Sequence, residues 1–137
     1  MTSSGETQII NGVSIHFTLD GPDGAPTLTF APALSLDLRS FDSQVAAFSD
    51  RYRVLRLDLR GHGFTDQGGG PFSMEDLADD VVGLLDHIGA DKTHFVGSSL
   101  GAMVGLALAF NHADRLSSLT FMASQGALPP ERLASAR

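Results

Sequence analysis

The sequence contains no cysteine, and its 9 Lys and Arg residues are outnumbered by 16 Asp and Glu residues. The absence of cysteine excludes disulfide bonds, thiolate metal sites and a cysteine nucleophile. A net charge of −7 without a basic stripe argues against a nucleic-acid partner, because clustered cations are needed to neutralise phosphates. The N-terminus has neither a basic segment nor an apolar run, and no apolar stretch is long enough to cross a bilayer. We therefore expect a cytoplasmic protein with no membrane or nucleic-acid partner.

The remaining composition is that of a globular protein. The chain has 137 residues, of which 42% are hydrophobic and 18% are charged, so it can bury a core and is not of the disordered class. The glycine-rich run at 68–71 is too short to separate two domains. We therefore predict one domain, residues 1–137.

Segments with strand and helix patterns alternate along the chain. Strands are predicted at 8–10, 13–19, 27–31, 52–59, 93–96 and 116–122, and helices at 41–48, 74–88 and 100–111. Ser73 is the predicted N-cap of the second helix, Asp76 occupies its capping-box position and Gly89 ends it. The Asn11-Gly12 pair between the first two strands is a hairpin signal. This order predicts an α/β fold whose sheet begins antiparallel and is then mainly parallel.

The pattern Gly97-Ser98-Ser99-Leu100-Gly101 lies between a predicted buried strand and a predicted helix. Gly-x-Ser-x-Gly is weak evidence by itself, but the strand before it and the helix after it are the context of a nucleophile elbow. Such a sharp turn strains its central residue, and small residues on both sides let strand and helix approach. Ser99 is the predicted nucleophile, and the backbone N–H of Leu100 is a predicted oxyanion donor. The alternative is that Ser99 is only an N-cap and the glycines only serve packing.

The elbow, together with Asp58-Leu59-Arg60-Gly61-His62-Gly63, resembles the N-terminal half of the α/β-hydrolases. Within that superfamily, the stretches 34–42 and 52–56 are similar to the β-ketoadipate enol-lactonases. The resemblance implies an α/β-hydrolase fold and a serine hydrolase acting on small-molecule esters or lactones, without a metal or organic cofactor. It also implies further strands, helices and a cap that would begin near Pro129-Pro130.

The resemblance implies a second oxyanion donor in the loop after the third strand, where this sequence has Leu34. The family usually carries His-Gly before the donor, or Asn-Ser in the lactonase-like group, whereas this sequence has Pro32-Ala33. Proline has no N–H and stiffens the loop. An oxyanion hole, the pair of backbone N–H groups that would bind the oxyanion, can still form, because it does not use these side chains. The specificity for a lactone is left open. Leu34 could equally be a plain core leucine.

A serine nucleophile needs a base and an acid, and in this fold both follow it in the sequence. His112 is the only histidine after Ser99, but it lies 13 residues along the same predicted helix, roughly 20 Å away. Asp114 fails for the same reason, and Glu131 has no histidine to orient. His62 is the only upstream candidate base, although the resemblance implies a structural role for it.

Other polar residues near these motifs receive structural interpretations. We expect His94 to be a hydrogen-bonded core residue and His16 and His87 to lie at surface or packing positions. Asp58 and Arg60 are expected to hold their own loop through hydrogen bonds.

The chain is therefore expected to carry the nucleophilic half of a hydrolase site and to be incomplete or inactive alone. The acid and the histidine would come from a C-terminal-half chain, an oligomer partner or a missing segment. The last predicted strand, 116–122, is expected to leave an open hydrophobic edge. A different function, a non-catalytic binding or assembly module that keeps the elbow as scaffold, stays open. So does related C–C hydrolase or perhydrolase chemistry.

Overall fold

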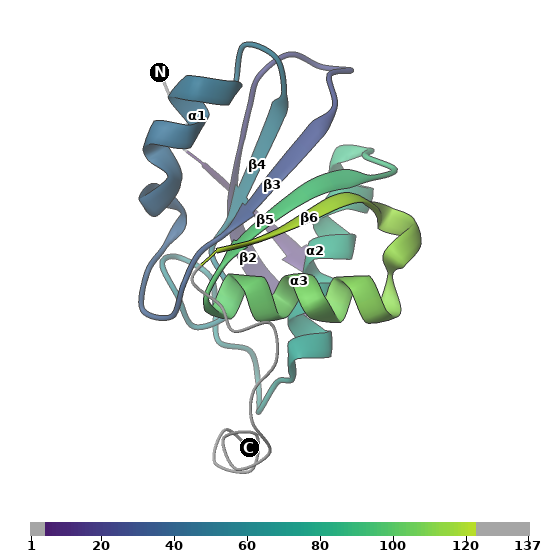
Figure 1. The fold of residues 1–137 in the computed structure, drawn as a ribbon. Coiled ribbons are helices and arrows are strands. Elements are labelled where there is room, and N and C mark those ends of the chain that lie inside the picture. Colours follow the sequence, from purple (N-terminus) through teal and green to yellow (C-terminus); the bar gives the residue numbers. More distant parts are fainter. Residues whose placement is uncertain (1–4, 123–137) are drawn as a thin grey trace.

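Six strands form one mixed sheet in the computed structural model, which describes residues 5–122 (Figure 1). Their order across the sheet is β1-β2-β4-β3-β5-β6. The strands are β1 Glu6–Ile10, β2 Val13–Asp20, β3 Thr27–Ala31, β4 Arg53–Leu57, β5 Thr93–Ser98 and β6 Leu116–Met122. β1 pairs with β2, and β2 with β4, in antiparallel fashion, whereas the pairs β4–β3, β3–β5 and β5–β6 are parallel. The predicted α/β fold with an antiparallel start is confirmed.

The antiparallel start is a tight hairpin. Asn11 and Gly12 connect β1 to β2, and both have positive φ, 51° and 79°. Two central residues with positive φ are the requirement of a type I′ turn, whose twist matches that of the flanking strands. The two-residue turn fixes the pairing register, in which Ile10 lies opposite Val13.

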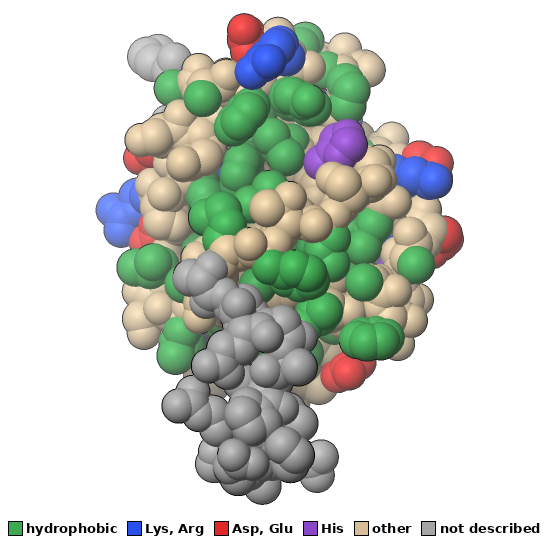
Figure 2. Space-filling model, viewed as in Figure 1, with side chains coloured by type: hydrophobic (Ala, Val, Ile, Leu, Met, Phe, Trp, Pro, Cys, Tyr) green, Lys and Arg blue, Asp and Glu red, His purple; other side chains and the backbone are tan. Residues whose placement is uncertain are grey.

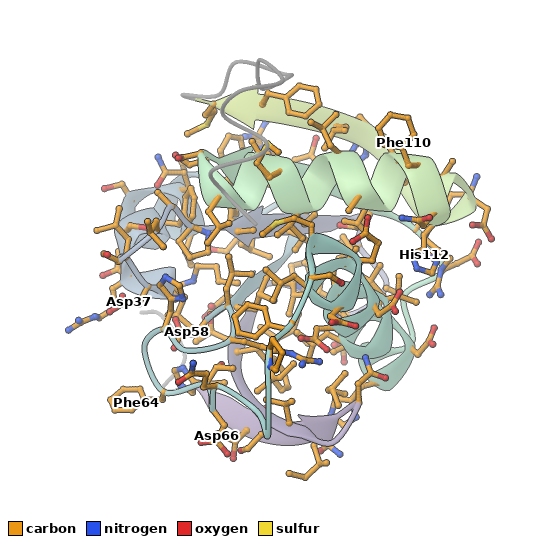
Figure 3. All side chains as sticks on the ribbon, turned by 90° about the horizontal axis from the view of Figure 1, so that it is seen from below. Asp37, Asp58, Phe64, Asp66, Phe110 and His112 are labelled. Atoms are coloured by element: carbon orange, nitrogen blue, oxygen red, sulfur yellow. The ribbon has the colours of Figure 1, made fainter. Side chains whose placement is uncertain are left out.

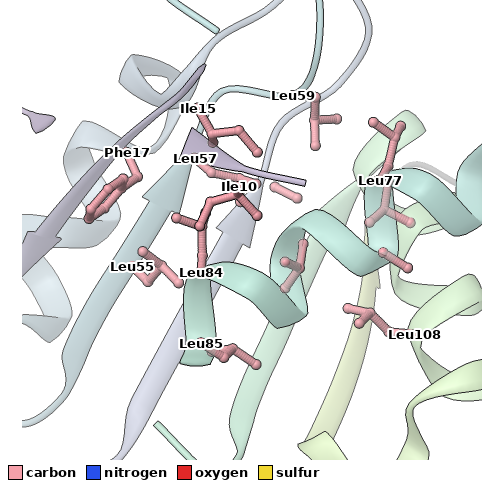
Figure 4. Packing of buried hydrophobic residues seen from close by; sticks show 14 of the residues in the cluster. Ile10, Ile15, Phe17, Leu55, Leu57, Leu59, Leu77, Leu84, Leu85 and Leu108 are labelled. Carbon is pink, nitrogen blue, oxygen red and sulfur yellow. The ribbon is translucent and has the colours of Figure 1, made fainter. Parts of the chain in front are cut away.

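The helices cover the two faces of the sheet unequally. α2 Met74–Ile88 and α3 Leu100–Asn111 pack with the sheet around the larger hydrophobic cluster (Figure 4). On the other face, α1 Asp42–Phe48 covers a smaller cluster built on β3 and β4. Two short 3-10 helices, η1 Leu38–Phe41 and η2 Ala113–Arg115, complete the described elements. None of the helices within residues 5–122 is long and apolar enough to cross a membrane.

The ends of α2 are set by local chemistry. The Ser73 side chain accepts a hydrogen bond from the Asp76 N–H at 3.1 Å, and the Asp76 carboxylate accepts from the Ser73 N–H at 2.8 Å. The second of these bonds holds the pKa of Asp76 below its ordinary value. Gly89 ends the helix in the left-handed conformation, with φ 75°. The predicted capping box and terminator are confirmed.

The strand bounds differ from the sequence prediction by one or two residues at several ends, and two C-terminal ends, those of β4 and β5, differ by two residues. β4 ends at Leu57 rather than at residue 59, and Asp58 turns its carboxylate into hydrogen bonds with other segments. β5 continues to Ser98, because Gly97 and Ser98 still pair with Phe121 and Met122 of β6. β6 lies at one edge of the described sheet, and its Phe121 and Met122 are exposed, as expected for an open hydrophobic edge.

Candidate active site

The carboxyl ends of the parallel strands bring the candidate residues to one edge of the sheet. β3, β4 and β5 run parallel, so the segments that follow Ala31, Leu57 and Ser98 all leave at that edge. Ala31 of β3 lies opposite Gly97 of β5 in the register. The loop that carries Leu34 therefore begins beside the elbow.

Ser99 has the strained backbone that the motif predicts. Its φ of 51° and ψ of −108° lie outside the regions that a side chain tolerates well, and α3 begins at the next residue. The Ser99 N–H donates to the Met122 carbonyl oxygen at 2.9 Å. The Ser99 carbonyl accepts from the N–H groups of Ala102 and Met103 at 3.0 and 3.2 Å. Hydrogen bonds on both sides thus hold a conformation that is unfavourable by itself.

Both glycines of the elbow are required by close approach of backbone to backbone. A Cβ atom at Gly97 would collide with the carbonyl of Gly101, the second residue of α3. A Cβ atom at Gly101 would collide with the carbonyl of Ala31 in β3. Strand and helix can therefore meet at this angle only with glycine at these two positions.

The start of α3 offers backbone N–H groups to an anion. The first N–H groups of a helix have no partner within the helix, and its dipole favours negative charge there. Leu100 is the first residue of α3 and follows Ser99 directly. An oxygen that becomes negative beside the Ser99 hydroxyl would meet these donors.

The candidate second donor lies on an exposed turn. Leu34 is 65% exposed, so its interpretation as a core leucine is wrong. The Leu36 N–H donates to the Ala33 carbonyl at 3.1 Å, and Ser35 has φ 65°. A positive φ at the third of four residues indicates a type II turn, in which glycine is the usual residue. We call residues 33–36 the oxyanion turn.

Asp58 connects three segments rather than its own loop alone. Its carboxylate, 1% exposed, accepts from the Phe64 N–H at 3.0 Å, as expected, but also from the Leu38 N–H at 2.8 Å. His16 Nδ1 of β2 lies 2.8 Å from the same carboxylate. Figure 3 shows Asp58 inside the molecule, with Phe64 pointing outward beside it.

Arg60 does not hold the loop in which it stands. It reaches α2 and donates to both carboxylate oxygens of Asp80, at 2.7 and 2.9 Å. These hydrogen bonds raise the pKa of Arg60 above its ordinary value. Asp80 also accepts a hydrogen bond from the Asn11 side chain at 3.1 Å, and this bond connects the β1–β2 hairpin to α2. The expected loop contact is replaced by a long-range one.

With this geometry established, the chain can be compared with known proteins. The family model of the alpha/beta hydrolase fold matches residues 26–135. The chain belongs to the α/β-hydrolase family. Over 109 residues it is 35% identical to 3-oxoadipate enol-lactonase 1 of Acinetobacter baylyi, a match that covers 80% of this chain and 41% of that protein.

Two solved hydrolase structures share the fold. The enol-lactonase from Burkholderia xenovorans LB400 matches with a TM-score of 0.80 and 39% identity, over 83% of this chain and 45% of that one. A hydrolase from Pseudomonas aeruginosa PA01 matches with a TM-score of 0.87 and 32% identity, over 97% of this chain and 52% of that one. The chain spans about half the length of these relatives or less.

Each histidine within residues 5–122 of this α/β hydrolase has a partner away from the elbow. His94 Nδ1 lies 2.7 Å from the Ser118 hydroxyl, and the His87 ring packs edge-on against Phe17. His62 Nδ1 lies 3.0 Å from the carbonyl oxygen of Arg60, within its own turn at the end of β4. His16 stands on β2, three strands from β5, which is roughly 14 Å at 4.8 Å per strand. His112 caps the far end of α3 and lies 2.7 Å from Asp79 (Figure 3). Within residues 5–122 we therefore find no histidine placed to activate Ser99.

A separate hollow lies on the sheet face that carries α1. Its volume is about 370 Å³, and Figure 2 shows hydrophobic side chains gathered on this side of the molecule. It is lined by Leu28, Phe30, Gln44, Phe48, Tyr52, His94, Val96, Ser118, Thr120 and Met122. His94 is half-buried here and lies 2.7 Å from the Ser118 hydroxyl, so its assignment to the core is wrong. Because residues of alternate positions on β3, β5 and β6 line it, the hollow lies on a face of the sheet rather than at the elbow.

Proposed function

We propose that this α/β hydrolase cleaves the ester or lactone bond of a small molecule, with Ser99 as nucleophile. The observation that carries the proposal is a serine held at φ 51°, ψ −108° between β5 and α3 by hydrogen bonds on both of its sides. Strain in a residue other than glycine persists only where its surroundings enforce it, and it is concentrated at functional sites.

The chemistry proceeds in two stages. The Ser99 hydroxyl oxygen attacks the substrate carbonyl carbon as its proton leaves, and the carbonyl oxygen becomes an oxyanion. The N–H groups of Leu100 and Leu34 donate to that oxygen. Collapse of the tetrahedral intermediate breaks the C–O bond, the proton taken from Ser99 passes through the base to the leaving alkoxide oxygen, and the acyl group remains as an ester on Ser99. Water then gives a proton to the same base and attacks this ester. The acid product leaves and ionises to the carboxylate, and the proton on the base returns to the Ser99 oxygen.

The proton of Ser99 needs a base that residues 5–122 do not supply in reach. We propose that the histidine and its orienting acid come from a C-terminal segment or from a partner chain that carries it. The length comparison supports this proposal, because the matched region covers 41% and 45% of two of its relatives. Glu131, the candidate acid in this chain, lies outside the described residues.

The substrate class rests on the relatives. A protein 35% identical over 109 residues is named for the lactone of 3-oxoadipate, and a second relative is an enol-lactonase. We propose a small ester or lactone in the cytoplasm, with neither metal nor organic cofactor. Pro32 and Ala33, where the oxyanion turn begins, stand in place of the polar residues of lactonase-like sequences, so the substrate need not be the same lactone.

Covalent labelling tests the proposal. The chain is treated with a fluorophosphonate probe, alone and with a complementing C-terminal segment, and the labelled residue is located by mass spectrometry. We expect labelling of Ser99 in the complemented protein and none in Ser99→Ala. Ser98→Ala, next to it, is the matched control and should still be labelled.

A folded, complemented protein that takes no label would overturn the proposal. That result would favour the second function, a binding or assembly module in which the elbow serves only as scaffold. Labelling that persists in Ser99→Ala would instead exclude Ser99 as the nucleophile.

A further inference from the structure

The carboxylate of Asp58 is surrounded by hydrogen-bond donors from distant parts of the chain. Oδ1 accepts from the Leu38 N–H, and Oδ2 accepts from the Phe64 N–H and lies 2.8 Å from His16 Nδ1. A Cβ atom at Gly63 would collide with this carboxylate, so the turn after β4 closes directly over it. A buried carboxylate with three such neighbours occupies a fixed position.

Leu38 is held through both its backbone N–H group and its backbone carbonyl. Its N–H donates to Asp58, and its carbonyl accepts from Nη1 of Arg56 at 3.0 Å. Arg56 is 1% exposed and is itself held by the Thr18 hydroxyl at 2.9 Å. Two buried charged side chains, Arg56 of β4 and Asp58 just after it, thus hold Leu38, the first residue of η1.

The oxyanion turn lies between the end of β3 and Leu38, whose backbone is held by Asp58 and Arg56. Ala31 ends β3 beside the elbow, and Leu38 is the next fully buried residue after Pro32. Between them, Leu34 and Leu36 are 65% and 50% exposed, so side-chain packing does not hold the turn in place. Its position depends on the strand at one end and on the hydrogen bonds of Leu38 at the other.

We propose that Asp58 is a positioning residue that sets the Leu34 N–H of the oxyanion turn against Ser99, with His16 holding its carboxylate. The inference rests on the proposed function of Ser99 and Leu34. Asp58 and His16 form an acid–histidine pair, but the histidine of this pair stands on β2, roughly 14 Å from β5 at 4.8 Å per strand, so it is not placed to take the Ser99 proton.

Asp58→Asn tests the proposal in the complemented protein. The amide keeps one oxygen, but its NH₂ group then faces donors where Oδ2 accepted. We expect the rate of fluorophosphonate labelling and kcat to fall about tenfold or more while KM changes less than about twofold, because a displaced oxyanion donor acts on the transition state. Asp80→Asn is the matched control: Asp80 is also a buried carboxylate, but it holds α2 and the hairpin. It should leave labelling and kcat within about twofold of the parent.

An NMR measurement of the chain keeps the two proposals separable. In Asp58→Asn the amide of Leu38 should exchange faster with solvent, and the amide resonance of Leu34 should shift; in Asp80→Asn both should be unchanged. Unshifted resonances in Asp58→Asn, or shifted ones with unchanged labelling and kcat, would overturn the positioning role. Failure of the unmutated, complemented protein to take the label would overturn the function of Ser99 alone, because the resonances still report on the turn.

Discussion

The two halves of the candidate site are held in place in different ways. The elbow is built from five consecutive residues, 97–101, whose glycines and helix start define its shape. The oxyanion turn depends on Asp58 and Arg56, which lie 20 and 18 residues from Leu38 in the sequence. One half is therefore visible as a motif, and the other exists only when three strands have assembled. Mutations should separate these two kinds of dependence.

The largest effect is expected from Gly97→Ala, which breaks the local half. The added Cβ atom meets the backbone of Gly101 and Ala102, which has no room to move. We expect the free energy of unfolding to fall by about 3 kcal/mol or more, as for severe overpacking. Urea unfolding followed by circular dichroism measures it.

Gly69→Ala is the control for that experiment, because a Cβ atom there meets nothing within 4 Å. It should change the free energy of unfolding by no more than about 0.5 kcal/mol. Equal stability of the two variants would show that the elbow does not need its close approach.

A smaller effect compares backbone strain in the two halves. Ser99 at φ 51°, ψ −108° is a conformation for glycine, whereas Ser35 at φ 65° is a milder case. Ser99→Gly should therefore exceed Ser99→Ala in unfolding free energy by about 1–2 kcal/mol, and Ser35→Gly should exceed Ser35→Ala by about 1 kcal/mol or less. Thermal and urea unfolding of the four variants measure these two differences in the free energy of unfolding. A larger gain at residue 35 would reverse the order of strain.

The smallest effect concerns the charge of Asp37, the residue that follows the oxyanion turn. The hydrogen bonds that Asp37 accepts from the Arg39 guanidinium hold the pKa of Asp37 below its ordinary value of 3.8. Because the folded pKa is the lower one, the stabilisation is complete above about pH 5 and is lost as the pH falls through the folded value. Carboxyl NMR titration should give a pKa below 3.8.

The pair is on the surface, so its contribution should be small and should decrease in high salt. Asp37→Asn should remove that part of the pH dependence of unfolding. A carboxyl group that titrates at or above its ordinary value would contradict the ion pair.

Much of the fold could be predicted from the sequence because the signals are local. The cap at Ser73 and Asp76 and the terminator Gly89 act within a few residues of one another, and each was found where the pattern predicts it. The predictions were wrong where a side chain makes its hydrogen bonds with a segment distant in the sequence. β4 stops at Leu57, and Arg60 pairs with Asp80 on α2 instead of holding its loop. Sequence spacing carries no signal for contacts of that range.

The cytoplasmic location and the single domain remain predictions from composition. So do the catalytic roles of Ser99, Leu100 and Leu34, which the labelling and kinetic experiments address.

The sequence by itself determined the elbow, the order of strands and helices, and hence the family, because a strand–glycine–serine–glycine–helix pattern encodes its own geometry. Only the tertiary structure decided that Leu34 is exposed rather than buried, and that Asp58 holds the segment following the oxyanion turn. The physical reason is that a buried carboxylate is satisfied by whichever donors folding brings to it. In this protein those donors come from Leu38, Phe64 and His16, which lie on three separate segments.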